Sequence, residues 1–373
     1  MPVRGPARDG FTWPPGPSTA RPLTSFGAEA LKSTPGRSTV SRVARVTKLR
    51  FERAHKARSL VWSGDALIDV AGGEAKVALG GPAKTSTINW AFNFDRALMG
   101  PSGLRALYTA TGTKGIVATP NRPVRELNRS YYCANAYEYP VAVGRLSDGR
   151  EALVHCPDGY NRLTVETLAY GERLCSATDQ AADVFHSRLQ LSPDGRYLLS
   201  AGWVWHPVGV ATVHDLDEAL EDEAHLDTWG VFPWLSTAGQ VEAACWADSD
   251  LIVVSTDPEE ERIDAEGYGL PEGHVGLWSM SEGAWVAHSP FDGHTGTMHQ
   301  LGQYTLCLFD HPRLMDPMTG EIVEEWPDIA TGHQRSCIMS RHKERVPPVA
   351  VDPARNRFAV AADDVVSVVE LED

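Results

Sequence analysis

The stretch RLQLSPDGRYLLSAG, residues 188–202, decides the fold of this chain. A short run stands on each side of Ser-Pro-Asp-Gly, and the second run is the more apolar of the two. Gly accepts the positive φ that a tight turn needs, and Ser and Asp side chains can bond back to the turn backbone. The stretch is therefore predicted to form a β-hairpin.

The same arrangement of a short run, a polar turn and a more apolar run occurs seven times. In chain order the seven are SLVW-SGDA-LIDV, RALM-GPSG-LRALY, VAVGRL-SDG-REALVH, SRLQL-SPDG-RYLLSA, EAACW-ADSD-LIVVS, TMHQL-GQ-YTLCLF and PVAV-DPARN-RFAVA. One turn residue from each gives the series Gly64, Gly103, Gly149, Gly195, Ser249, Gly302 and Asn356, spaced by 39, 46, 46, 54, 53 and 54 residues. The mean period of about 49 residues is typical of a four-stranded propeller blade. We therefore predict an all-β chain folded as a seven-bladed β-propeller.

Two of the repeats also carry a recognisable motif. The stretch VGLWSMSEGAWVAHSPFDGHTG (residues 275–296), together with residues 188–202, resembles WD40 and YVTN-type repeats, in which a Trp-containing strand precedes a turn and a Gly-His dipeptide. Gly293-His294 matches that dipeptide, whereas no repeat ends in Trp-Asp. The resemblance covers residues 58–373 in its period, and it implies the propeller fold without implying a particular function.

The last repeat indicates how the ring closes. It contains PVAV, RFAVA and VVSVVEL, which are three strands, before Asp373. The stretch VARVTKLRFER, residues 43–53, alternates apolar and basic residues as an outer edge strand does. We expect this N-terminal strand to complete the seventh blade and close the propeller. A helix over the same residues is the alternative.

Charge divides the chain into two parts. The first 50 residues hold nine basic and two acidic residues, or +7, which leaves −22 for the rest of a chain whose formal net charge is −15. Residues 1–40 are rich in Pro, Gly, Ser and Thr and are predicted to be a disordered basic arm, and residues 41–373 to be the propeller. The acidic body favours a basic partner and repels anionic lipid, and contact with nucleic acid is expected only through the arm, if the arm has a role.

Several classes of protein and site are not indicated by the sequence. No apolar run has the length that a signal peptide or a membrane span needs, and the six cysteines include no CxxC pair. A cytoplasmic, monomeric protein with reduced thiols is expected. The motifs GxSxG, GxGxxG after a strand, HExxH and the P-loop are also missing, and Asp292, His294 and His299 match no metal-binding spacing, so no metal or cofactor is predicted.

The candidate binding residues fall in the loops that join second to third strands and one blade to the next. These loops share one end of the strands, which we call the loop-rich face. The leading prediction is a scaffold that binds a protein or peptide partner on this face, and its candidate residues are Tyr137, Glu138, Trp203, Trp205, His206 and Tyr268. Aromatic side chains with an acidic rim are suited to partner recognition. A packed aromatic corner is the alternative interpretation of WVWHP, residues 203–207.

An enzyme is the alternative function, either a hydrolase or a lyase with a His and Asp site at the mouth of the central channel. Its candidate catalytic residues are His206, His299, His311 and Asp310, which would have to converge on one reacting atom. The acidic run at residues 257–266 is expected to be a solvated loop, and residues 215–227 a short polar helix or an inserted loop.

Overall fold

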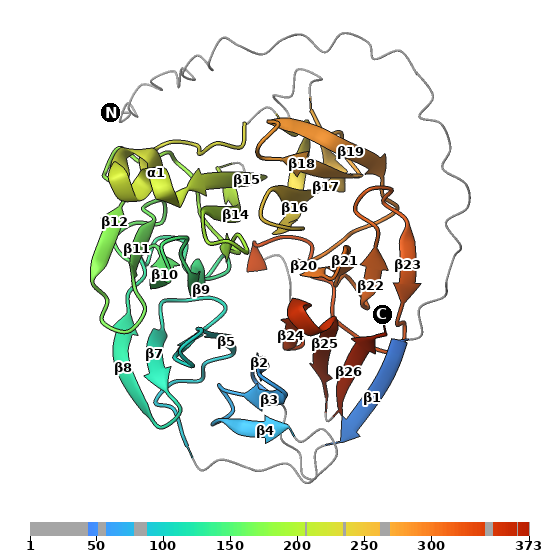
Figure 1. The fold of residues 1–373 in the computed structure, drawn as a ribbon, viewed down its shortest axis with the longest axis horizontal. Helices are drawn as coiled ribbons and strands as arrows, with labels where there is room; N and C mark the ends of the chain where they lie inside the picture. Colours follow the sequence, from blue (N-terminus) through green and yellow to red (C-terminus); the bar gives the residue numbers. More distant parts are fainter. Residues whose placement is uncertain are drawn as a thin grey trace, which may run out of the picture. The chain divides into compact units, whose positions relative to one another are not determined.

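The computed structural model describes residues 44–50, 57–77, 88–205, 207–233, 236–261, 269–339, 346–363 and 365–372. The chain divides into two units, Met1–Ser41 and Arg42–Asp373, and all of the described residues belong to the second. The predicted arm, residues 1–40, therefore lies outside the described residues. The second unit is a seven-bladed β-propeller, as predicted, with its blades arranged in chain order around a common centre (Figure 1).

Each blade is an antiparallel sheet in which every strand pairs with the next. Blade 1 contains β2 (Val61–Ser63), β3 (Ala66–Asp69) and β4 (Ala75–Val77); blade 2 contains β5 (Arg96–Met99), β6 (Arg105–Tyr108), β7 (Gly115–Thr119) and β8 (Arg122–Leu127); blade 3 contains β9 (Val141–Arg145), β10 (Glu151–His155), β11 (Thr164–Thr167) and β12 (Arg173–Ser176). Blade 4 contains β13 (Gln190–Leu191), β14 (Tyr197–Val204) and β15 (Val208–Asp215); blade 5 contains β16 (Gly239–Trp246), β17 (Leu251–Glu261), β18 (His274–Ser279) and β19 (Ala284–Pro290). Blade 6 contains β20 (Met298–Leu301), β21 (Tyr304–Cys307), β22 (Arg313–Met315) and β23 (Ile322–Glu325); blade 7 contains β24 (Val349–Asp352), β25 (Arg357–Ala362), β26 (Val365–Leu371) and β1 (Ala44–Arg50).

All seven predicted hairpins are confirmed. Six of the seven predicted turn residues have positive φ, and Ser249 is the exception. In the turn that contains Ser249, the Asp248 carboxylate accepts hydrogen bonds from the backbone N–H groups of Asp250 at 2.7 Å and Leu251 at 2.8 Å. A side-chain acceptor thus stabilises the one turn that lacks a left-handed residue.

The predicted closure of the ring is also confirmed. Strand β1 pairs antiparallel with β26, from Ala44 opposite Leu371 to Arg50 opposite Val365. The helical alternative for this stretch is therefore wrong. A hydrophobic cluster joins blade 7 to blade 1, so the two ends of the propeller are also packed against each other.

Within the described residues, seven hydrophobic clusters lie between neighbouring blades, one for each pair. The second strand of a blade is packed on both faces, and Ala152, Leu153 and Val154 of β10 are all completely buried. An outermost strand such as β19 instead alternates exposed and half-buried residues. This difference explains why the second run of each hairpin is the more apolar.

Blade 4 departs from the expected four strands within the described residues. Strand β15 leads directly into α1 (Leu216–Glu221) and the 3-10 helix η1 (Glu223–Asp227). A separate 3-10 helix, η4 (Pro353–Arg355), precedes β25 in blade 7. The Asp215 carboxylate caps α1 by accepting a hydrogen bond from the backbone N–H of Asp217 at 3.0 Å. The predicted polar helix is thus confirmed. In blade 1, residues 78–87 lie outside the described residues.

Candidate functional site

The segment between blades 6 and 7 crosses the loop-rich face and reaches the far side of the ring. Residues 331–339, which we call the strap, follow β23 yet contact the connection between blades 2 and 3. The backbone N–H of Glu138 donates to the Cys337 carbonyl at 2.9 Å, and the Gln334 amide donates to the Glu138 carboxylate at 2.9 Å. The strap lies near the centre of the ring in Figure 1, between β14 and β20.

Six aromatic rings pack together on the loop-rich face, next to the strap. This aromatic cluster consists of Tyr132, Tyr137, Tyr160, Phe185, Trp203 and Trp205. Phe185 stacks on Tyr160 at 4.2 Å and on Trp203 at 3.9 Å between ring centroids, and the other three rings lie 5.5 to 5.9 Å from it. Two backbone hydrogen bonds, of 2.8 and 3.1 Å, join Phe185 to Trp203 and hold their rings opposite each other. Stacking and backbone pairing together make this a rigid support.

The aromatic cluster has a buried part and an exposed part. Trp203 is 4% exposed, whereas Trp205 and Tyr132 are each 48% exposed and the adjacent Tyr131 is 85% exposed. We call Tyr131, Tyr132 and Trp205 the aromatic patch. The two interpretations of residues 203–207 therefore each apply to one Trp, because Trp203 is packed and Trp205 faces solvent.

An acidic side chain is bonded to the aromatic cluster. The Tyr160 hydroxyl, in the same aromatic cluster, donates to the exposed Asp183 carboxylate at 2.6 Å. The exposed Asp158, two residues before Tyr160 in the sequence, is already paired with Arg173 at 2.9 Å, so Asp183 is the acidic group available here. Burial and the bond to Asp183 both raise the pKa of Tyr160, so its hydroxyl remains a neutral donor. The surface beside the patch can therefore attract a cation.

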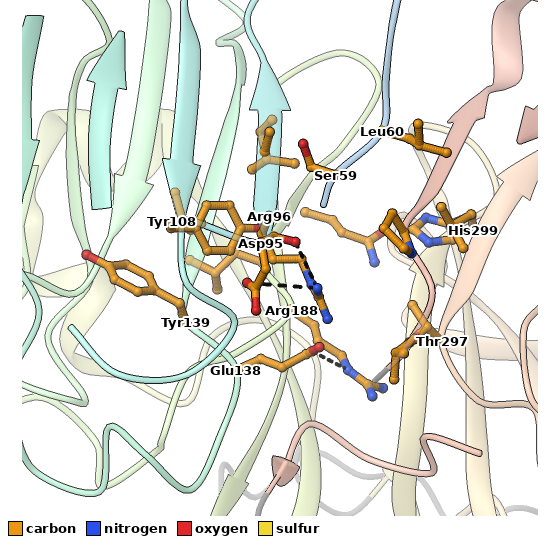
Figure 2. Close-up of a pocket in the computed structure, with 18 of the residues that line it drawn as sticks. Ser59, Leu60, Asp95, Arg96, Tyr108, Glu138, Tyr139, Arg188, Thr297 and His299 are labelled. Atoms are coloured by element: carbon orange, nitrogen blue, oxygen red, sulfur yellow. Dashed lines mark hydrogen bonds and ion pairs between the residues drawn. The ribbon is translucent and has the colours of Figure 1, made fainter. Parts of the chain in front are cut away.

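A cavity of about 470 Å³ occupies the centre of the ring. Its wall is formed largely by the first strands β5, β9, β13, β20 and β24, and Gln334 of the strap contributes to it. Figure 2 shows the side chains of Arg96 and Arg188 between Glu138 on one side and His299 on the other. The wall of the cavity thus includes the ionisable side chains of Arg96, Glu138, Arg188 and His299.

Glu138, a predicted binding residue, lies in this cavity and is bonded at both oxygens. One oxygen accepts from Nε of Arg188 at 2.9 Å and the other from the Gln334 amide at 2.9 Å. Burial alone would raise the pKa of Glu138, but the charges of Arg188 and Arg96 outweigh it and lower that pKa. Glu138 is therefore ionised at neutral pH, and it attaches the strap to the wall of the cavity.

The other predicted binding residues lie in different surroundings. Tyr137 and Trp203 are buried in the aromatic cluster, so they support the exposed rings and their own side chains do not reach solvent. Trp205 belongs to the aromatic patch. His206 and Tyr268 lie outside the described residues.

The predicted catalytic residues fall into two groups. His299 lines the central cavity, where burial, assisted by the charge of Arg188, lowers its pKa to about 4. Asp310 and His311 are not among the residues that line that cavity; they lie 3.1 Å apart in the β21–β22 loop, and Asp310 also meets His333 at 3.2 Å. His206, the fourth residue, is outside the described residues.

Three residues of the site were missed by sequence reasoning. Phe185 stands alone in an interblade connection, where no periodic pattern indicates burial. Arg188 opens the hairpin that decides the fold, and a charged residue there suggests exposure rather than a buried ion pair. Gln334 is 196 residues from its partner Glu138, a separation over which no local pattern operates.

Two buried histidines in blade 4 give a prediction about pH. The rings of His186 and His214 lie 5.7 Å apart, and burial lowers the pKa of His214 from 6.5 to about 4 and that of His186 well below 6.5. The unfolded chain therefore binds more protons than the folded one below pH 6.5, so stability is present at pH 7 and is lost as the pH falls toward 4. His214 alone should contribute about 2 kcal/mol to the loss between pH 7 and pH 5.

Urea denaturation at pH 7 and pH 5 measures this loss. His214→Gln should reduce the difference between the two pH values by about 2 kcal/mol. His225→Gln, at a half-exposed ring, is the control and should leave the difference as it is in the parent protein. His294 acts in the opposite direction, because its hydrogen bond to Glu242 raises its pKa and the resulting stability is lost as the pH rises. An equal pH dependence in the parent protein and His214→Gln would contradict the prediction.

The described residues contain neither a membrane-crossing helix nor a metal-binding cluster. None of the helices among them is long and apolar enough to cross a membrane. In the same residues, no group of three or more His, Cys, Asp or Glu side chains has an arrangement that could hold a metal ion.

Comparisons with known proteins identify the fold. No protein-family model and no curated protein matches the chain. A chain of a mitotic checkpoint complex is 12% identical, with 94% of this chain and 100% of that chain covered and a TM-score of 0.55. The Pan2 WD40 domain of Neurospora crassa is 11% identical, with 89% of this chain and 97% of that chain covered and a TM-score of 0.55. A streptogramin B lyase is 7% identical, with 88% of this chain and 98% of that chain covered and a TM-score of 0.53. Identities this low show the fold alone, which is that of a WD40-like seven-bladed propeller.

Proposed function

We propose that this protein is a scaffold that binds a protein partner through the aromatic patch on its loop-rich face. The observation that carries the proposal is the placement of two half-exposed rings, Trp205 and Tyr132, against a stack of fully packed ones. Trp and Tyr are enriched among the residues that dominate binding energy at protein interfaces. Rings that are already held in place also lose little side-chain entropy when a partner binds.

The partner that fits best is a short segment with a basic residue beside an apolar anchor. Asp183 accepts a hydrogen bond from Tyr160 of the aromatic cluster, and residues 51–373 carry a formal net charge of −22. The negative electrostatic potential of these charges speeds the approach of a cationic segment and disfavours acidic competitors. Because exposed charges are screened by salt, binding should weaken as ionic strength rises.

Affinity measurements with single substitutions test the proposal. A partner recovered with the full chain from cells of its source would be purified, and its Kd measured by isothermal titration. Trp205→Ala and Tyr132→Ala should each weaken binding by about tenfold or more, since truncating such anchors costs about 2 kcal/mol or more.

Tyr170→Ala is the matched control for these variants. Tyr170 is as exposed as Tyr131 but lies in the β11–β12 turn, at the other end of the strands from the loop-rich face. Its substitution should leave Kd unchanged. Unchanged binding in both patch variants, or loss of binding in Tyr170→Ala, would rule out the aromatic patch as the binding surface.

The enzymatic alternative has less support. Of its four candidate residues, Asp310 and His311 are in contact, but His299 lines a cavity to which neither contributes. A streptogramin B lyase shares the fold at 7% identity, a level that carries no information about the activity of this chain. A binding function needs only the aromatic patch, whose rings are already in place. We therefore favour a binding function over an enzymatic one.

The compartment and the oligomeric state belong to the same proposal. Five of the six cysteines are buried and all six are free. Burial raises the pKa of Cys156 and of Cys337 to about 12, which keeps these thiols protonated and unreactive. Such thiols fit a reducing compartment, and we propose a cytoplasmic monomer.

A further inference from the structure

The central cavity contains buried hydrogen-bond donors that lack acceptors. The Arg188 side chain is 6% exposed; its Nε donates to Glu138 and one Nη to the Glu242 carbonyl at 3.2 Å, while the other Nη has no partner. The hydroxyl of Thr331, a strap residue that lines the same cavity, is also buried without a partner. Leaving such groups unsatisfied costs about 1–3 kcal/mol each.

The acidic side chains of the cavity already have hydrogen-bond partners of their own. Both oxygens of Glu138 are already bonded, to Arg188 and Gln334. One oxygen of Asp95 accepts from the backbone N–H of Ala110 at 2.7 Å, and the same oxygen lies 3.9 Å from the nearest guanidinium nitrogen of Arg96. Arg96 itself donates to the backbone carbonyl of Asp95 at 3.0 Å. Among the described residues that line the cavity, the buried donors without a partner are therefore one Nη of Arg188 and the Thr331 hydroxyl.

Apolar side chains also line the cavity. Leu60, Leu98, Val143 and Leu191 line it together with the polar residues. A ligand that suits both kinds of lining needs acceptor oxygens for the unpartnered donors and a small hydrocarbon body for the apolar side chains. A carboxylate matches a guanidinium in shape and charge, and such charge-assisted hydrogen bonds are about twice as strong as neutral ones.

We infer that the central cavity is a binding site for a small carboxylic acid in its ionised form. The carboxylate is held by Arg188, Thr331 and Arg96, and the hydrocarbon part of the ligand lies against the leucines. His299, which is neutral at pH 7, adds no competing charge. Because Thr331 and Gln334 belong to the strap, the bound acid also ties the strap to the cavity wall. The inference does not depend on the aromatic patch.

Titration of the full chain with three probes tests the inference at pH 7. Pentanoate is the carboxylate with an apolar body, pentanamide is its neutral counterpart, and inorganic phosphate is an anion without an apolar body. Ligand-observed NMR and isothermal titration measure each Kd. Pentanoate should bind at least about tenfold more tightly than either of the other probes, because only it both pairs with the guanidinium groups and contacts the apolar side chains of the cavity.

Two substitutions locate the binding. Thr331→Val removes the unpartnered hydroxyl at nearly constant volume, and Arg96→Gln removes a guanidinium whose ion pair is long. Each should weaken pentanoate binding about fivefold or more. Arg188→Gln is less suitable, because it would leave the buried Glu138 without its ion pair. Arg173→Gln, at an exposed arginine on the outer strand β12, is the control and should change nothing.

Three results would overturn the inference. The first is no detectable pentanoate binding to the folded parent protein. The second is equal pentanoate affinity in the parent protein, Thr331→Val and Arg96→Gln, with circular dichroism showing all three folded. The third is phosphate or pentanamide binding as tightly as pentanoate.

Discussion

Removal of residues 1–50 is expected to leave the protein unable to fold into a soluble monomer. The deletion takes away β1, and with it every partner on the outer side of β26. Strand β26 has the sequence VVSVVEL, and an unpaired edge of this composition is a template for aggregation. The lost hydrogen bonds and packing should cost on the order of 5 kcal/mol, which is comparable to the whole free energy of unfolding of a marginally stable domain.

A shorter deletion is the control for this experiment. Removal of Met1–Ser41 takes away the first unit and leaves β1 (Ala44–Arg50) intact. The free energy of unfolding of this protein, measured by urea denaturation, should equal that of the full chain to within about 0.5 kcal/mol. Equal folding of the two truncated proteins would show that β1 does not close the ring.

The second large effect is expected at Trp203. Its ring is buried, stacks on Phe185 at 3.9 Å between centroids, and meets Tyr137 at 5.9 Å and Trp205 at 5.5 Å. Trp203→Ala leaves a cavity at the centre of the aromatic cluster, and the free energy of unfolding should fall by about 3–5 kcal/mol. Trp203→Phe keeps a stacked ring and should recover more than half of that loss.

Trp205→Ala separates packing from recognition. Trp205 lies two residues after Trp203, but its ring is half exposed. Its removal should therefore lower the free energy of unfolding by less than about 1 kcal/mol. Urea denaturation of the three variants at pH 7 measures both effects. Similar losses in Trp203→Ala and Trp205→Ala would mean that the two rings do not have the separate roles assigned to them.

The fold could be predicted from the sequence because its determinants are local. A turn such as Ser-Pro-Asp-Gly at residues 192–195 specifies its own geometry, and the apolar second run follows from packing between two blades. The closing strand followed from counting, since the last repeat held three strands and residues 43–53 had the pattern of a fourth. For residues 215–227 the sequence favours either a short helix or an inserted loop and does not decide between them. The structure has the helix, and blade 4 therefore continues from β15 into α1 rather than into a fourth strand.

The site could be predicted only in part, because it depends on contacts between distant segments. Tyr137 lies in the connection between blades 2 and 3, but Trp203, predicted in a loop, lies within strand β14. A list of aromatic residues from the sequence also does not tell which of them are buried. That distinction comes from the stack on Phe185 and from the strap, which reaches Glu138 from 196 residues away. The exposed Trp205 could therefore be separated from the buried Trp203 only in three dimensions.

Site-specific photo-crosslinking is the most direct test of whether a protein partner binds the aromatic patch. It reports contact with the loop-rich face without altering the rest of the surface. A photoreactive phenylalanine analogue would replace Trp205 in one protein and Tyr170 in another, and each would be irradiated in cells of the source organism. We expect a discrete crosslinked protein from position 205, identified by mass spectrometry, and we expect the unmodified chain to compete with its formation. No crosslinked protein is expected from position 170. The same crosslinked protein from both positions, or a crosslink from position 170 alone, would contradict this expectation.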